Sequence, residues 1–140
     1  MSVTAETHRV DFVLGPDPRF LRAVSAAVAV LGSEAGFDPL DTQNLGAAAE
    51  TACEDTFPQL PHESTQLSVT VESFLDRLEI TLAHRGESAP AVGLETFAAQ
   101  AGAHGSKGPA LLQSVDRVQY DSSGGVARTR LVKYLPRKAG

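Results

Sequence analysis

Two short runs of alternating apolar and polar residues, separated by a few positions, constrain the fold of this chain more than any other feature. The apolar members are Leu67, Val69 and Val71 in the first run, and Leu78, Ile80 and Leu82 in the second. An alternation with a period of two places the apolar side chains on one face of a strand. We therefore predict two antiparallel strands joined by a short turn around residues 73–76, with one face buried and the other in water.

Two helices are predicted before this hairpin, because an aspartate followed by a helix-opening proline occurs twice. Asp17 precedes Pro18, and Asp38 precedes Pro39. The first helix has an apolar face at helical spacing, made of Phe20, Leu21, Val24, Val28 and Leu31. The second has a face of mostly small residues suited to close packing, made of Leu40, Leu45, Ala48, Ala49, Ala52 and Cys53. The residues expected to end them are Gly32 and Gly36 for the first helix, and Pro58 and Pro61 for the second.

The remaining elements complete an α+β pattern. A first strand is predicted over residues 10–14, a long loop over 84–108, a short helix over 109–116, and a final hairpin from residue 118 to 135 with its turn at 122–125. The 140 residues suit a single domain, 1–140. The element order predicts a two-layer sandwich, in which helices pack on one face of a mixed, mostly antiparallel sheet.

Charge is distributed unevenly along the chain. Residues 1–106 hold 15 acidic residues and 5 Lys or Arg, whereas residues 107–140 hold 2 acidic residues and 7 Lys or Arg. A basic segment of this kind suits phosphates or an acidic partner. The alternative is that Arg128, Arg130 and Lys133 occupy outward or edge positions of a strand. Aromatic residues are not interleaved with this charge, so nucleic-acid binding is not predicted.

The sequence also indicates a compartment. No apolar run approaches the roughly 20 residues of a membrane span, and the first residues lack a basic stretch followed by an apolar core. The single cysteine, Cys53, cannot form an internal disulfide. We therefore expect a cytoplasmic protein that does not associate with membranes.

Three short segments of the sequence stand out by their residue types and their places on the predicted elements. Glu50 and Glu54 are four positions apart on the second predicted helix, so they share a helical face. His84 and Gly86 follow the strand that ends near Ala83. The third segment reads Gly105-Ser-Lys107-Gly108.

The order and spacing of these segments resemble the histidine-kinase-like (Bergerat-fold, GHKL) ATPases, and most closely the small anti-sigma-factor serine/threonine kinases. The resemblance covers residues 9–135. It implies that Glu50 is the general base and that Glu54 stands where an asparagine holds magnesium. It also implies that His84 stands where an aspartate binds adenine. The resemblance also assigns nucleotide binding to Gly86, which follows His84, and to Gly105, Lys107 and Gly108 of the third segment.

Two of these positions depart from the family pattern. A neutral histidine offers one accepting nitrogen and a bulkier ring where an aspartate is expected, and a failed pairing of this kind is costly. Glu54 adds negative charge close to a triphosphate, and Lys107 is the only obvious basic candidate to offset it. We expect ATP and magnesium to bind weakly or not at all. Glu50 then has the alternative role of a solvated helix residue.

The resemblance implies a partner-switching regulator of bacterial transcription or signalling, with a degenerate ATP site. Its expected partners are a sigma factor or an anti-sigma antagonist protein, and it is expected to form a homodimer. Two alternatives stay open. One is an active ATP-dependent serine/threonine kinase that phosphorylates the antagonist, and the other is an accessory protein-binding domain of a signalling complex.

Overall fold

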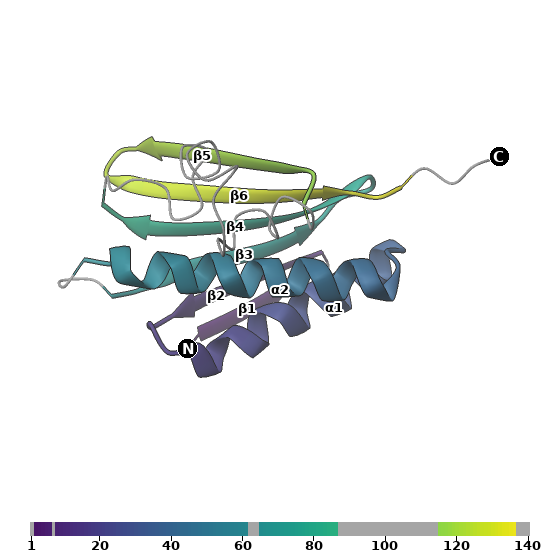
Figure 1. The fold of residues 1–140 in the computed structure, drawn as a ribbon, viewed down its shortest axis with the longest axis horizontal. Helices are drawn as coiled ribbons and strands as arrows, with labels where there is room; N and C mark the ends of the chain where they lie inside the picture. Colours follow the sequence, from purple (N-terminus) through teal and green to yellow (C-terminus); the bar gives the residue numbers. More distant parts are fainter. Residues whose placement is uncertain (1, 7, 62–64, 87–114, 137–140) are drawn as a thin grey trace, which may run out of the picture.

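The computed structural model describes residues 2–6, 8–61, 65–86 and 115–136. These residues form six strands and two α-helices (Figure 1). In chain order they are β1 (Ser2–Glu6), β2 (Arg9–Leu14), α1 (Leu21–Ala35), α2 (Pro39–Thr56), β3 (Leu67–Ser73), β4 (Arg77–Arg85), β5 (Arg117–Ser123) and β6 (Val126–Tyr134). Two 3-10 turns, Pro18–Phe20 and Phe57–Gln59, precede α1 and follow α2.

The strands form one sheet in the order β1-β2-β3-β4-β6-β5, and every neighbouring pair is antiparallel. Both helices lie on one face of this sheet, where α1 packs against β2, β3 and β4 (Figure 1). The fold is therefore the predicted α+β two-layer sandwich. The other face of the sheet has no helix over it among the described residues.

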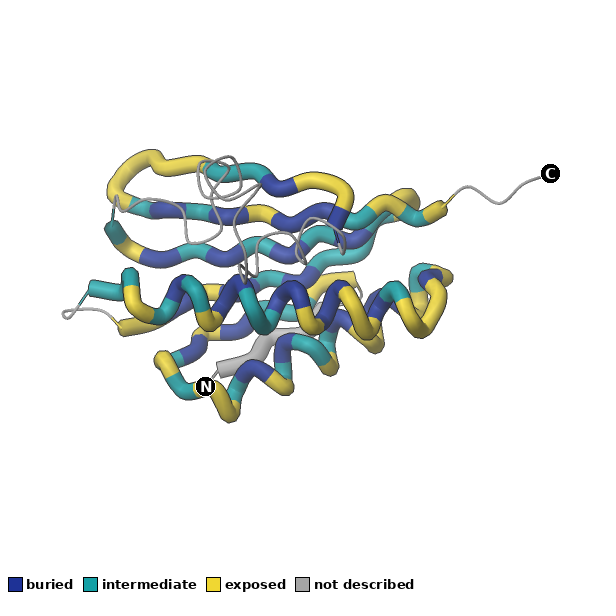
Figure 2. The backbone as a smooth tube through the Cα atoms, in the orientation of Figure 1, coloured by how far each residue is buried: buried dark blue, intermediate teal, exposed yellow. Residues whose placement is uncertain are grey.

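The predicted β3–β4 hairpin is confirmed. Val69 pairs with Leu82, and Val71 pairs with Ile80, so the apolar residues of both strands point to the same face. That face contacts α1, whose core residues are Leu21, Val24, Val28 and Leu31. Figure 2 shows the resulting alternation of buried and more exposed positions along the strands. Burial of these side chains on one face is the main force holding the two layers together.

The two helix starts are also confirmed. The carboxylates of Asp17 and Asp38 each accept a hydrogen bond from a backbone N–H two residues later, at 3.0 Å and 2.8 Å respectively. Asp17 caps the 3-10 turn that leads into α1, rather than α1 itself. Leu40 is 61% exposed, although Thr42 in the same turn of α2 is buried, so the assignment of Leu40 to the packing face was wrong.

The two glycines expected to end α1 have different roles. Gly36 is the C-cap, with a φ of 98° that favours glycine. Gly32 is instead inside the helix, so its prediction as a terminal residue is wrong. A Cβ atom built on Gly32 would lie 2.4 Å from Cγ2 of Thr42 on α2. Gly32 therefore allows the two helices to approach closely.

Three further predictions are corrected by the structure. A strand, β1, precedes the one predicted to be first; its five residues show too little apolar patterning to indicate a strand. The loop does not begin at residue 84, because β4 continues to Arg85 through pairing with β6. Of the helix predicted over 109–116, residues 109–114 lie outside the described residues, while Val115 and Asp116 are not helical. Asp116 instead accepts a hydrogen bond from the backbone N–H of Tyr134 at 2.7 Å.

Candidate functional site

The two carboxylates predicted at the phosphate and metal positions lie one turn apart on α2. Glu50 is half-buried and lines a groove between α1 and α2, together with Arg22 and Gly46. The groove has a volume of about 640 Å³. Glu54 is exposed. The two side chains thus share a side of the helix but differ in environment.

Cys53 is adjacent to Glu54 in the sequence and points into the core. Its side chain is buried, and burial together with the negative charges of Glu50 and Glu54 raises the pKa of the thiol to about 12. The thiol is therefore protonated at neutral pH and is not a nucleophile there. Its place is structural.

His84 lies on the covered face of the sheet, because it continues the buried alternation of β4 after Leu82. The residue is 7% exposed. Its Nδ1 lies 2.8 Å from the carbonyl oxygen of Arg85. A carbonyl oxygen only accepts, so Nδ1 carries the proton and donates this hydrogen bond. When the imidazole is neutral, Nε2 is the single nitrogen left to accept.

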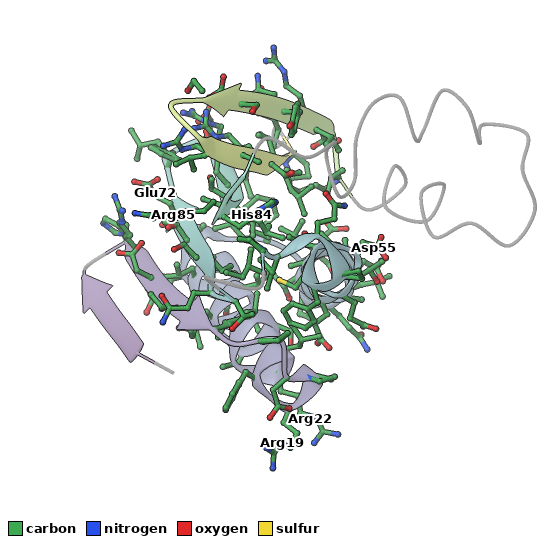
Figure 3. All side chains as sticks on the ribbon, turned by 90° about the vertical axis from the view of Figure 1, so that its left-hand side faces the viewer. Arg19, Arg22, Asp55, Glu72, His84 and Arg85 are labelled. Carbon is green, nitrogen blue, oxygen red and sulfur yellow. The ribbon has the colours of Figure 1, made fainter. Side chains whose placement is uncertain are left out.

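Figure 3 shows how neighbouring positions of β4 diverge. His84 points toward the side of the sheet that faces α2, whereas Arg85 points to the opposite side, where Glu72 also lies. Gly86 follows with a φ of 123°, and its N–H donates to the carbonyl oxygen of Gly125 at 2.9 Å. A Cβ atom on Gly86 would meet only His84, at 3.9 Å. Glycine is thus favoured here by the backbone conformation rather than by lack of space.

The structure does not bring all the predicted residues into one cavity. Neither His84 nor Gly86 is among the described residues that line the groove beside Glu50. Gly105, Lys107 and Gly108 lie outside the described residues. The described part of the predicted site is therefore divided between two elements: Glu50 and Glu54 lie on α2, whereas His84 lies on β4 and Gly86 directly follows it.

Glu54 and His84, at the positions that the resemblance assigns to magnesium and adenine, differ in chemistry from the asparagine and aspartate of the family pattern. A carboxylate offers two accepting oxygens, whereas His84 offers one nitrogen after its hydrogen bond to Arg85. Magnesium prefers oxygen ligands in tight octahedral geometry. Within the described residues, no cluster of three or more His, Cys, Asp or Glu side chains has a metal-binding arrangement.

A set of arginines on the other face of the sheet belongs to the basic segment whose composition suits phosphates or an acidic partner. Arg117 on β5 and both Arg128 and Arg130 on β6 line a shallow hollow of about 680 Å³. The sequence does contain the signal for this cluster. The glycine pair at 124–125 has φ values of 60° and 75°, which define a two-residue hairpin turn. That turn fixes the register that puts every second residue of both strands on one face.

The comparisons with known proteins identify no family. No family model matches the sequence, and no curated protein matches it significantly. Neither of the two α-helices that the structure describes has the combination of length and hydropathy needed to span a membrane.

Proposed function

We propose that this chain is a cytoplasmic, protein-binding regulator of the partner-switching, anti-sigma type, whose nucleotide chemistry is weakened or lost. The partner would be a sigma factor or an antagonist of anti-sigma proteins, and the chain would act as a homodimer. The proposal combines the resemblance of the sequence motifs with the α+β sandwich.

The observation that carries the proposal is the environment of His84. Its ring is buried on the sheet face, and its Nδ1–H is already used by the carbonyl oxygen of Arg85. An aspartate at this position offers the base two accepting oxygens, whereas a neutral His84 keeps one acceptor, Nε2, on a bulkier ring, and a mismatch at such a position lowers affinity strongly. Glu54, at the position of the magnesium-binding asparagine, is exposed on α2.

Calorimetric titration with ATP and magnesium tests the loss of nucleotide binding. We expect no binding at micromolar ATP for the natural chain, and a gain of binding when His84→Asp and Glu54→Asn are combined. The Glu54→Asn variant alone is the control, because it leaves the histidine in place. Micromolar binding by the natural chain that disappears in Glu50→Ala would contradict the proposal.

A second function, an active ATP-dependent serine/threonine kinase, is favoured by one feature of the same histidine. With its proton on Nδ1, a neutral His84 has an accepting Nε2, which has the same hydrogen-bonding polarity as a carboxylate oxygen. If the chain is an active kinase, His84→Leu should abolish ATP binding, because leucine has no acceptor for the base. The regulator requires that the same substitution leave partner binding intact.

The choice of partner is tested by co-purification from the native host, with the sigma factors and antagonist proteins of that host detected individually. Recovery of one of them with the natural chain is expected. If the chain instead brings down components of another signalling complex and no sigma factor or antagonist, the accessory-domain alternative is correct. Light scattering on the purified chain measures whether it dimerises.

A further inference from the structure

The face of the sheet opposite the helices carries a basic cluster near one side. The cluster consists of Arg117, Arg128 and Arg130, and we call it the arginine face. Arg130 pairs in register with Gln119 on β5 and with Thr81 on β4. Neighbouring positions in antiparallel strands point the same way, so these side chains surround one shallow hollow of about 680 Å³. The only carboxylate among its described lining residues is Asp121.

Intramolecular ion pairs leave much of this positive charge available. Arg128 lies 3.6 Å from Asp121, and Arg130 lies 3.5 Å from Glu79. Both distances exceed those of a good charge-assisted hydrogen bond. Glu79 is held more closely by Arg77, at 2.6 Å. It therefore neutralises Arg130 only in part.

Arg117 has a neutral partner. With the Gln119 amide oriented to satisfy its hydrogen bonds, its oxygen accepts from the Arg117 guanidinium at 3.1 Å and 3.2 Å. No carboxylate among the described residues forms an ion pair with Arg117. The amide orients this guanidinium without neutralising it, which leaves it suited to bind a carboxylate.

The helical layer has the opposite charge. Residues 18–56, which include both helices, hold six acidic residues and two arginines. An acidic ligand is therefore repelled by the helical layer and attracted to the arginine face. The two arginines of that layer, Arg19 and Arg22, lie at the far end of the molecule from β5 and β6 (Figure 3).

We propose that the arginine face binds an acidic segment of a partner protein. Arg117, Arg128 and Arg130 would pair with its carboxylates. The inference rests on the proposed function in taking the chain to be a protein-binding domain. Single-stranded nucleic acid fits less well, because it needs aromatic side chains on which bases can stack. The one aromatic residue among the described residues lining the hollow, Tyr120, pairs in register with the buried Thr129, so its side chain lies on the other face of β5 from Arg128 and Arg130.

The test uses fluorescence anisotropy with a short labelled polyglutamate peptide and the full chain. The double variant Arg128→Gln/Arg130→Gln should bind the peptide about tenfold more weakly, because two charge-assisted contacts are lost. Arg19→Gln/Arg22→Gln is the matched control, since it also removes two positive charges, and its affinity should change less than about twofold. An equal loss in both variants, or no binding by the natural chain, would overturn the proposal.

Two further titrations on the same samples separate the possible failures. A labelled oligothymidine that binds more tightly than the peptide, and that depends on the same two arginines, would assign the face to nucleic acid and overturn the proposal. Tight binding of ATP with magnesium would count against the proposed function alone. In that case a selective loss of peptide binding in the Arg128/Arg130 variant would still support the arginine face.

Discussion

The two faces of the sheet differ more than any other pair of surfaces in this molecule, although they are made by alternate residues of the same strands. On β4, Ile80 is fully buried against the helical layer. The next residue, Thr81, lines the hollow of the arginine face. The face covered by the helices contributes to the free energy of folding through apolar burial. The arginine face carries exposed charge, which contributes little to stability. Stability and the proposed binding of an acidic segment should therefore be separable by mutation, and substitutions on adjacent residues can test this.

The largest effect is expected for Ile80→Ala on the covered face. Removing a fully buried side chain leaves a cavity between β4 and α1, and we expect the free energy of unfolding to fall by about 3 kcal/mol. Thr81→Ala, one residue away on the outer face, should change it by less than about 0.5 kcal/mol. Urea unfolding monitored by circular dichroism measures both. Similar losses in the two variants would show that the faces are not energetically distinct.

The next largest effect on stability is expected from Gly32, where α1 and α2 pack closely against each other. In Gly32→Ala the added methyl group would lie 2.4 Å from Cγ2 of Thr42, so either the Thr42 side chain must leave its present rotamer or α1 and α2 must move apart. We expect a loss of about 2 kcal/mol, typical of overpacking. Gly15→Ala is the control, because no atom lies within 4 Å of its added Cβ. Thermal unfolding of both variants is the measurement, and an unchanged melting temperature for Gly32→Ala would contradict this helix crossing.

A smaller, pH-dependent effect is expected from the buried thiol of Cys53. Its pKa is raised from an ordinary value of 9.0 to about 12, because burial and two nearby carboxylates disfavour the thiolate. The folded state therefore binds this proton more tightly than the unfolded state. Its contribution to stability is complete below pH 9 and is lost as the pH rises toward 12.

The measurement compares natural chain and Cys53→Ala in urea at pH 9 and pH 10. The stability of the natural chain should fall by about 1 kcal/mol more than that of the variant over this interval. Cys53→Ala is expected to be less stable at every pH, because it leaves a small cavity. The tyrosines and lysines titrate in both proteins, so their contributions cancel when the two pH dependences are compared. Parallel pH profiles would show that the thiol is not shielded as the structure implies.

These elements also show what the sequence could predict. The hairpin of β3 and β4 was predictable, because six apolar residues at a period of two admit no other half-buried arrangement. The starts of both helices were predictable from Asp17 and Asp38, since the capping carboxylate and the following proline act locally. The end of α1 was predictable only in part, because Gly36 is the C-cap as expected but Gly32 is not a terminal residue. Gly32 resembles a terminal glycine in sequence, and only the tertiary contact with Thr42 explains its place inside the helix.

The candidate sites divide in the same way. The helical spacing of Glu50 and Glu54 was predictable, but the groove that Glu50 lines depends on how α1 packs against α2, which the spacing within one helix does not determine. Arg128 and Arg130 were considered as outward or edge positions. They do point outward, whereas β6 is not an edge strand, because it lies between β4 and β5. Strand order depends on pairing across the sheet as a whole, and local patterns do not determine it.

The smallest effect on stability is expected on the arginine face itself. The side chain of Arg130 is 46% exposed and its ion pair with Glu79 is long, at 3.5 Å. Arg130→Gln should therefore change the free energy of unfolding by less than about 0.5 kcal/mol, measured by urea unfolding. A loss above about 1 kcal/mol would mean that Arg130 stabilises the sheet. Because the folded state is expected to be preserved, weaker binding of an acidic peptide by an Arg130 variant would report on the surface contact and not on unfolding.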